Sequence, residues 1–111
     1  MAETVVDDEL WDDFHRVVNM SSRELGDWLR TEAASAVAER EPDRSGPEIG
    51  RQVLAILGKR RTDLTAGDVT VMRRVVATVT AERRDDLEPV TGDAQFRHRL
   101  MCLGHDPLKA A

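Results

Sequence analysis

Apolar residues recur at helical spacing between residues 64 and 84, where the chain has its clearest two-faced pattern. At about 100° per residue, one arc collects the apolar side chains Val69, Met72, Val75, Val76 and Val79. The opposite arc collects small or polar side chains, which are Thr70, Arg73, Arg74, Ala77, Thr78, Thr80, Ala81 and Arg84. Thr65 and Asp68 have the spacing of a capping box, which satisfies backbone N–H groups of a first helical turn. The pattern predicts a helix over 64–84 with a buried face and a basic face.

Two further helices are predicted in the first third of the chain. Apolar residues at helical spacing follow an acidic cluster at residues 7–9, and they are Leu10, Trp11, Phe14, Val17 and Val18. They predict a helix over 8–18 whose aromatic side chains anchor the core. Ser21 and Glu24 then form a complete S-x-x-E capping box, so a second helix is predicted from there to about residue 40.

A third helix is predicted after the loop 41–46, which is rich in charge and contains Pro and Gly. Pro47 suits the first turn of this helix, and the cations of Lys59-Arg60-Arg61 suit its last turn, at the negative end of the helix dipole. Two glycines lie within it. Gly50 or Gly58 could permit close contact with another helix, or Gly58 could mark a fraying end.

The C-terminal part is predicted to hold a polar loop over 85–94 and a short last helix over 95–103, closed by Gly104 as its C-terminal cap. With residues 1–6 as a flexible lead-in, the chain reads as an all-α single compact domain. It should contain four main helices and a short C-terminal helix.

Length and composition limit the chain to one modest core. A chain of 111 residues is long enough for a single domain, 1–111, and too short for two cores of ordinary size. Its one cysteine, Cys102, excludes an intrachain disulfide, and no apolar run reaches the roughly 20 residues that span a bilayer. We therefore expect a cytoplasmic protein with no membrane partner.

The formal net charge of −5 is distributed unevenly along the chain. Residues 1–48 hold 13 acidic against 5 basic side chains, a net charge of −8, whereas residues 49–111 hold 11 basic against 8 acidic, a net charge of +3. An acidic total argues against a nonspecific nucleic-acid coat, which normally requires a basic domain. A local basic face in the second half remains compatible with this total.

Candidate nucleic-acid-binding residues lie on and just before the basic helix face, and they are Lys59, Arg60, Arg61, Arg73, Arg74 and Arg84. Their cations could contact DNA phosphates, and the small residues Ala77, Thr80 and Ala81 would let the helix approach the backbone. The alternative is a solvated face that forms ion pairs with the acidic first half, and the composition favours this alternative.

A weak candidate metal set is formed by His98, Cys102 and His105, which are spaced i, i+4 and i+7. Because Gly104 should end the helix before His105, packing and capping roles are favoured, and no metal or other cofactor is expected. Gly104, His105, Asp106 and Pro107 are instead predicted to form a structural turn, with the aspartate carboxylate holding the backbone.

Catalytic patterns are weak in this sequence. Ser21, His15 and Asp12 could be assembled into a triad on paper, but their spacing provides neither a strained nucleophile turn nor an oxyanion hole. No GxxxxGK[ST], GxGxxG or HExxH motif occurs. We therefore expect no enzymatic activity.

Four segments together resemble a known family: VNMSSRELGDWLRT (18–31), SGPEIGRQVLAILGKRRTDLT (45–65), D-x-x-x-M-R-R-V-V (68–76) and LGHDPLK (103–109). The family consists of small bacterial and fungal proteins and is called domain of unknown function number three thousand one hundred and forty. Its members have no established activity. Some carry the label of DNA-binding protein, so the resemblance implies a nucleic-acid role at most.

The sequence also departs from the pattern of that family. Members usually have a histidine where Val71 stands, before Met72, and a stretch rich in tyrosine and histidine where this chain has residues 77–84. A function that rested on those groups in relatives would be lost here.

These observations predict a non-enzymatic small helical binding module that associates with DNA through its basic helix face. The alternative is a protein-interaction or self-association module with no nucleic-acid binding, since the acidic and basic halves could attract one another between molecules.

Overall fold

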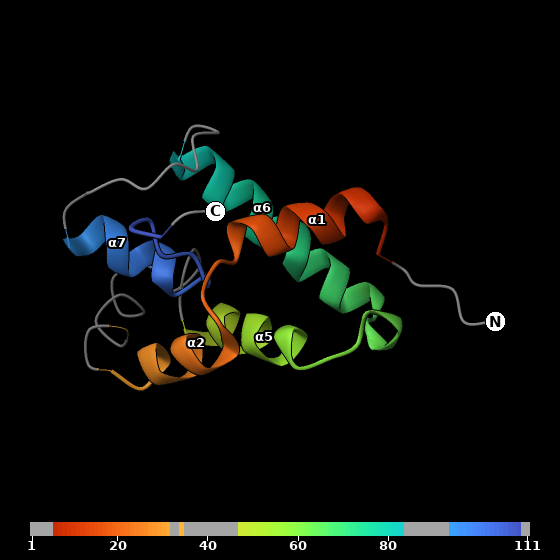
Figure 1. The fold of residues 1–111 in the computed structure, drawn as a ribbon, viewed down its shortest axis with the longest axis horizontal. Helices are drawn as coiled ribbons and strands as arrows, with labels where there is room; N and C mark the ends of the chain where they lie inside the picture. Colours follow the sequence, from red (N-terminus) through yellow and green to blue (C-terminus); the bar gives the residue numbers. More distant parts are fainter. Residues whose placement is uncertain (1–5, 32–33, 35–46, 84–93, 110–111) are drawn as a thin grey trace.

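Five α-helices form the described part of the chain in the computed structural model, which covers residues 6–31, 34, 47–83 and 94–109 (Figure 1). They are α1 (Asp8–Val17), α2 (Ser22–Leu29), α5 (Pro47–Leu57), α6 (Ala66–Arg83) and α7 (Ala94–Met101). A single 3-10 turn, Arg61–Asp63, links α5 to α6, and no strand occurs in these residues. The prediction of an all-α fold is confirmed. The predicted loop 41–46 and nearly all of 85–94 lie outside the described residues.

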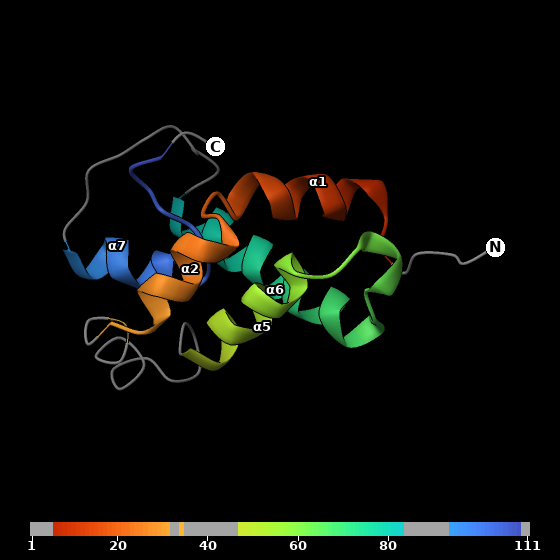
Figure 2. The same cartoon turned by 60° about the horizontal axis from the view of Figure 1, so that its bottom comes forward.

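The helices pack as two pairs that share a common core. In Figures 1 and 2, α1 lies across α6, and α2 lies against α5; the contacts between α5 and α6 join the two pairs. After α7 the chain returns towards the connection between α1 and α2, where the Met20 N–H donates to the carbonyl of Gly104 over 3.1 Å. The C-terminal segment is therefore part of the packed structure.

The predicted helix starts are confirmed by their caps. Ser21 Oγ accepts from the Glu24 N–H over 3.1 Å, and the Glu24 carboxylate accepts from the Ser21 N–H over 2.9 Å. Thr65 and Asp68 exchange the same two bonds, at 3.2 and 2.9 Å. Each cap joins residues three positions apart, so local sequence is sufficient to specify it.

Two predicted helix ends are wrong. The second helix ends at Leu29 and does not continue to residue 40, because the chain turns at Arg30 and the Thr31 hydroxyl accepts from the Ala34 N–H over 3.2 Å. Short hydroxyl side chains compete for backbone groups in this way and interrupt a helix. Of the predicted continuation, 35–40 lies outside the described residues.

The third helix ends at Leu57, four residues before Arg61, the last residue of its predicted final turn. Gly58 marks this end, since its N–H is shared between the carbonyls of Leu54 and Ala55 at 3.3 and 3.2 Å. Gly50 permits close contact between helices, which was the other role considered for these glycines. A Cβ at this position would lie 2.7 Å from the carbonyl oxygen of Cys102. Its lack of a side chain lets α5 approach the end of α7 closely.

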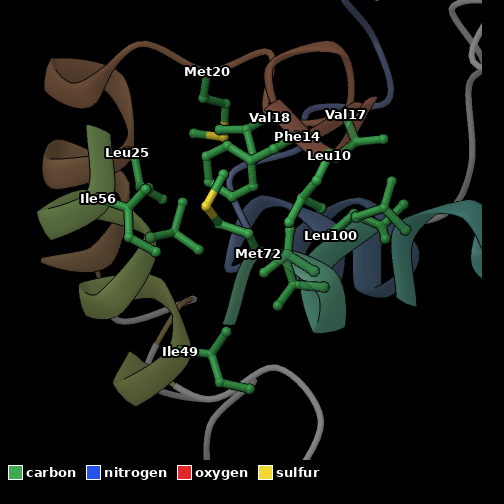
Figure 3. Close-up of a cluster of buried hydrophobic side chains, with 14 of the residues drawn as sticks. Leu10, Phe14, Val17, Val18, Met20, Leu25, Ile49, Ile56, Met72 and Leu100 are labelled. Atoms are coloured by element: carbon green, nitrogen blue, oxygen red, sulfur yellow. The ribbon is translucent and has the colours of Figure 1, made fainter. Parts of the chain in front are cut away.

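The core is built around Phe14, which is fully buried between Met20 and Met72 (Figure 3). The apolar arc predicted for α6 faces this core. Met72, Val75 and Val79 are buried, while Val69 and Val76 are partly buried at its margin. Trp11, predicted as a core anchor, is only partly buried and packs against the margin of the core.

Candidate functional site

The cations of the predicted nucleic-acid set are largely occupied by carboxylates of the same chain. Lys59 Nζ lies 2.7 Å from an oxygen of Asp68, and Arg60 Nε lies 3.0 Å from an oxygen of Asp63. Burial alone would raise the pKa of Asp68, but the hydrogen bonds from Lys59 and Thr65, together with the positive charge of Lys59, lower it overall. Arg84 lies outside the described residues.

Two other members of this set reach the acidic start of the chain. Arg61 Nη2 lies 2.7 Å from Asp8 Oδ1 and donates to the carbonyl of Val6 over 2.9 Å. Arg73 Nη2 lies 3.7 Å from Asp7 Oδ2. The structure thus gathers Arg61 and Arg73 around the N-terminus of α1, where both meet negative charge, while Arg74 is exposed on α6.

A groove of about 670 Å³ lies between α1 and α6. Its lining residues are Asp7, Glu9, Leu10, Asp13, Arg16, Arg73, Val76, Ala77, Thr80 and Ala81. Its two walls follow from helical periodicity. On α1 the lining residues 9, 13 and 16 are spaced i, i+4 and i+7, and on α6 the residues 73, 77 and 80 repeat that spacing, so each set forms one stripe.

Within the part of the chain that the structure describes, the charges of the groove are paired except at one position. Asp7 and Arg73 form one pair, and Asp13 pairs with Arg16 over 3.1 Å. The exposed carboxylate of Glu9 makes no ion pair or side-chain hydrogen bond with any described residue. Among the described residues, the groove therefore presents one carboxylate without an ion-pair partner, that of Glu9, beside a floor of small residues.

A second polar region is the C-terminal turn, residues 104–109, and at its centre the imidazole of His105 is completely buried. His105 Nδ1 lies 2.6 Å from the carbonyl oxygen of Val17, and Nε2 lies 2.6 Å from Arg83 Nη1. A carbonyl can only accept and a guanidinium can only donate, so this network assigns the proton to Nδ1 and leaves Nε2 as the acceptor.

The surroundings of His105 favour its neutral form. Burial lowers the pKa of this histidine, and the positive charge of Arg83 lowers it further, while the bond to the Val17 carbonyl opposes the shift. A protonated ring would place a donor and a positive charge against the guanidinium. The turn is therefore built for a neutral imidazole.

Asp106 holds the next part of the C-terminal turn. Its carboxylate accepts two bonds of 3.2 Å from Arg97 and one of 3.0 Å from the Leu108 N–H. Its backbone pairs with the Asn19 side chain, which accepts from the Asp106 N–H over 2.7 Å and donates to the Asp106 carbonyl over 3.0 Å. Burial alone would raise the pKa of this carboxyl, but the bonds from Arg97 and Leu108 lower it overall.

Lys109 closes the C-terminal turn against the start of α2. Its ammonium donates to the Glu24 carboxylate over 2.6 Å and to the Asn19 carbonyl over 3.2 Å. The bond from Lys109 is the largest cause that lowers the pKa of Glu24, to about 2. The turn is thus tied to the connection between α1 and α2, and to α6 and α7.

The weak metal candidates are not brought together as a ligand set. The ring of His98 lies 4.9 Å from that of Trp28, whose Nε1–H donates to the Cys102 sulfur over 3.4 Å. Burial raises the pKa of this thiol. Both nitrogens of His105 have partners elsewhere, and within the described ranges no group of three or more His, Cys, Asp or Glu could hold a metal ion.

Sequence reasoning missed two residues of the C-terminal turn's surroundings. Arg83 is buried, and it follows Met72, Val75 and Val79 by eleven, eight and four positions, so its place on the apolar arc was a usable signal. No comparable signal marks Asn19, which lies in a connection between helices.

The fold and the site define a small all-α protein that combines an open groove with a buried polar turn. The chain belongs to the family described as protein of unknown function (DUF3140), whose profile matches residues 13–101. That span ends before the C-terminal turn. No curated protein and no solved structure matches the chain. Within the described residues, none of the helices has the length and apolar character needed to cross a membrane.

Proposed function

We propose that this protein is a non-enzymatic interaction module that binds a protein partner in the groove between α1 and α6. The observation that carries the proposal is the pairing of Arg73 with Asp7 beside the groove, together with that of Arg61 with Asp8. A phosphate backbone would have to displace these carboxylates before it could use the two guanidinium groups.

The groove itself suits a macromolecular partner. Ala77 and Ala81 are exposed on its α6 side, so a partner can approach the helix backbone closely. Among the described residues that line it there is no His, Cys or Ser, the side chains most used as nucleophile or general base. Asp7 and Asp13 are held in ion pairs, which supports a binding role over catalysis.

Site-specific photo-crosslinking tests this proposal. A photoreactive amino acid at position 77 should yield a discrete crosslinked protein in an extract of the source cells, and the substitution Ala81→Trp should abolish that product by filling the groove. The same probe at Asp27, exposed on α2, is the matched control. Equal products from both positions, or a product that survives Ala81→Trp, would overturn the groove as the binding site.

Binding of DNA is a second candidate, which the exposure of two arginines favours. The side chains of Arg60 and Arg73 are 83% and 61% exposed. If DNA binds here, the acidic start of α1 competes with phosphate. Asp7→Asn with Asp8→Asn should then strengthen duplex binding in a gel-shift titration at low salt, and Arg73→Ala with Arg74→Ala should weaken it. Asn at position 7 keeps the helix cap, so the fold is retained. If neither the wild-type protein nor the Asp7→Asn, Asp8→Asn variant shifts the duplex at low salt, this candidate is rejected.

A further inference from the structure

We propose that the occupant of the groove is an α-helix of the partner, which lies along α1 and α6 and places a lysine or arginine opposite Glu9. This inference rests on the proposed function and adds the partner's secondary structure and its charge. It uses three features of the groove: the composition of its walls, its dimensions and the one charge that has no partner among the described residues.

The walls favour a helix over an extended peptide. Both are α-helices, and most of the lining residues lie within them, where backbone N–H and C=O groups are used within the helix; the first turn of α1, which includes Glu9, keeps N–H groups without intrahelical partners. An extended segment would therefore find few backbone partners here, and no continuous row of them like that at the edge of a sheet. A helix satisfies its own backbone groups and makes contacts through its side chains, so its binding does not depend on backbone partners in the groove.

The dimensions agree with a short helical segment. Lining positions run from 73 to 81 on α6, which at 1.5 Å per residue is about 12 Å of groove, or a little over two turns. A partner helix of that length presents apolar side chains at i, i+3 or i+4, and i+7. Because Ala77 and Ala81 are small, such a helix could pack at an axis separation of about 8 Å, the close end of the usual range.

The charge defines the polar part of the partner. Asp7 and Asp13 are compensated by Arg73 and Arg16, so among the described charges of the groove the carboxylate of Glu9 is the group left to attract a cation. A lysine or arginine on the partner helix would complete this set. A phosphate group would instead be repelled by Glu9, so the same feature disfavours nucleic acid as the occupant.

Selection from a displayed library of helical peptides tests the inference. The full-length protein is used as bait, and binders are kept only if Ala81→Trp removes their binding. We expect these groove binders to share one Lys or Arg beside an apolar stripe. Glu9→Gln should weaken their Kd about threefold, the effect of one exposed ion pair. Glu9→Lys should weaken it by at least about tenfold, because it replaces attraction with repulsion.

A charge swap and a control complete the experiment. Selection on Glu9→Lys should enrich Glu or Asp at the position that wild type fills with a cation. Asp12→Lys, a matched reversal at an exposed residue of α1 outside the groove lining, should leave the selected sequences unchanged. Circular dichroism of each variant checks that the helices are intact.

The outcomes separate this inference from the proposed function. Groove binders with no preference for a cation, or binders containing proline in place of a helix, overturn the helical cationic partner while the groove remains a binding site. If no selected peptide is sensitive to Ala81→Trp and no crosslink forms at position 77, both the inference and the proposed function fail. A second copy of this chain as the crosslinked product also overturns the inference.

Discussion

The C-terminal turn and the α1–α6 groove both gather charged and polar side chains, and they differ in how completely their charges are satisfied. In the turn, both ring nitrogens of His105 and the carboxylate of Asp106 have partners within the chain. In the groove, the Glu9 carboxylate has none among the described residues. A buried polar group without a partner costs stability, so the turn has to be complete, whereas an open surface can keep a charge unused.

This difference separates a structural role from a binding role. The turn joins the connection between α1 and α2 to α6 and α7, and its polar groups already have partners in these elements. Substitutions in it should therefore change the free energy of unfolding. Substitutions at exposed groove positions such as Glu9 should change partner binding and leave the free energy of unfolding nearly unchanged.

The largest expected effect comes from removing the imidazole. His105→Ala should lower the free energy of unfolding by about 3–5 kcal/mol, because it opens a cavity and leaves the Val17 carbonyl and one Arg83 N–H without these bonds. Chemical denaturation followed by circular dichroism measures the change. His105→Asn, whose amide can still donate to Val17, should cost less. A loss below about 1 kcal/mol for His105→Ala would contradict a structural role for the turn.

Adding a methyl group at Gly104 should have the next largest effect. Gly104 has φ +87°, and a Cβ there would lie 2.9 Å from Val18 Cγ1. Strain at positive φ and the overlap together should cost about 2–4 kcal/mol in Gly104→Ala. The matched control is Gly67→Ala in the first turn of α6, where the nearest atom is 3.6 Å away. There alanine should be neutral or stabilising, by up to about 1 kcal/mol. Equal midpoints for the two variants in thermal unfolding would reject the argument.

Acid should weaken the turn by protonating its histidine. The folded protein holds the pKa of His105 below the ordinary value of 6.5, so the unfolded chain binds more protons as the pH falls. Stability should be constant above about pH 7.5 and fall below pH 6.5, by at most about 1.4 kcal/mol per pH unit, until the folded-state pKa is reached. Denaturation at pH 7.5 and 5.5 measures this loss.

The control for the pH experiment is His105→Asn, in which the loss between pH 7.5 and 5.5 should shrink. The carboxyls of Glu24 and Asp106 also have lowered pKa values, but their contribution is lost only at more acid pH, below their ordinary values of 4.5 and 3.8. An unchanged slope in His105→Asn would show that another group causes the effect.

The smallest effect is expected in the groove. Glu9→Gln should change the free energy of unfolding by no more than about 0.5 kcal/mol, chiefly through a weaker interaction with the helix dipole in the first turn of α1. Denaturation at neutral pH checks this value. A loss above about 1.5 kcal/mol would mean that Glu9 has a structural role, and the contrast between the two regions would disappear.

Local patterns were sufficient wherever the interacting residues are close in sequence. The caps at Ser21 and Thr65 each depend on a partner three residues later, and the apolar arc of α6 depends on a repeat within one helix. Both were therefore predictable. The ends of α2 and α5 were not predictable in this way. Thr31 and Gly58 also occur inside helices, and they end one only where other hydrogen bonds of the local backbone are more stable than a further helical turn.

The tertiary structure alone decided which charged groups meet. Arg61 pairs with Asp8 from 53 residues away, and the Val17 carbonyl meets His105 from 88 residues away. With 16 Lys and Arg side chains and 21 Asp and Glu side chains, composition offers many combinations and no means of choosing among them. Helical periodicity placed Arg73 on an exposed face, but only the packing of α1 across α6 put Asp7 beside it and left Glu9 without a partner among the described residues. Periodicity acts within one helix, whereas ion pairing depends on distances that packing between helices sets.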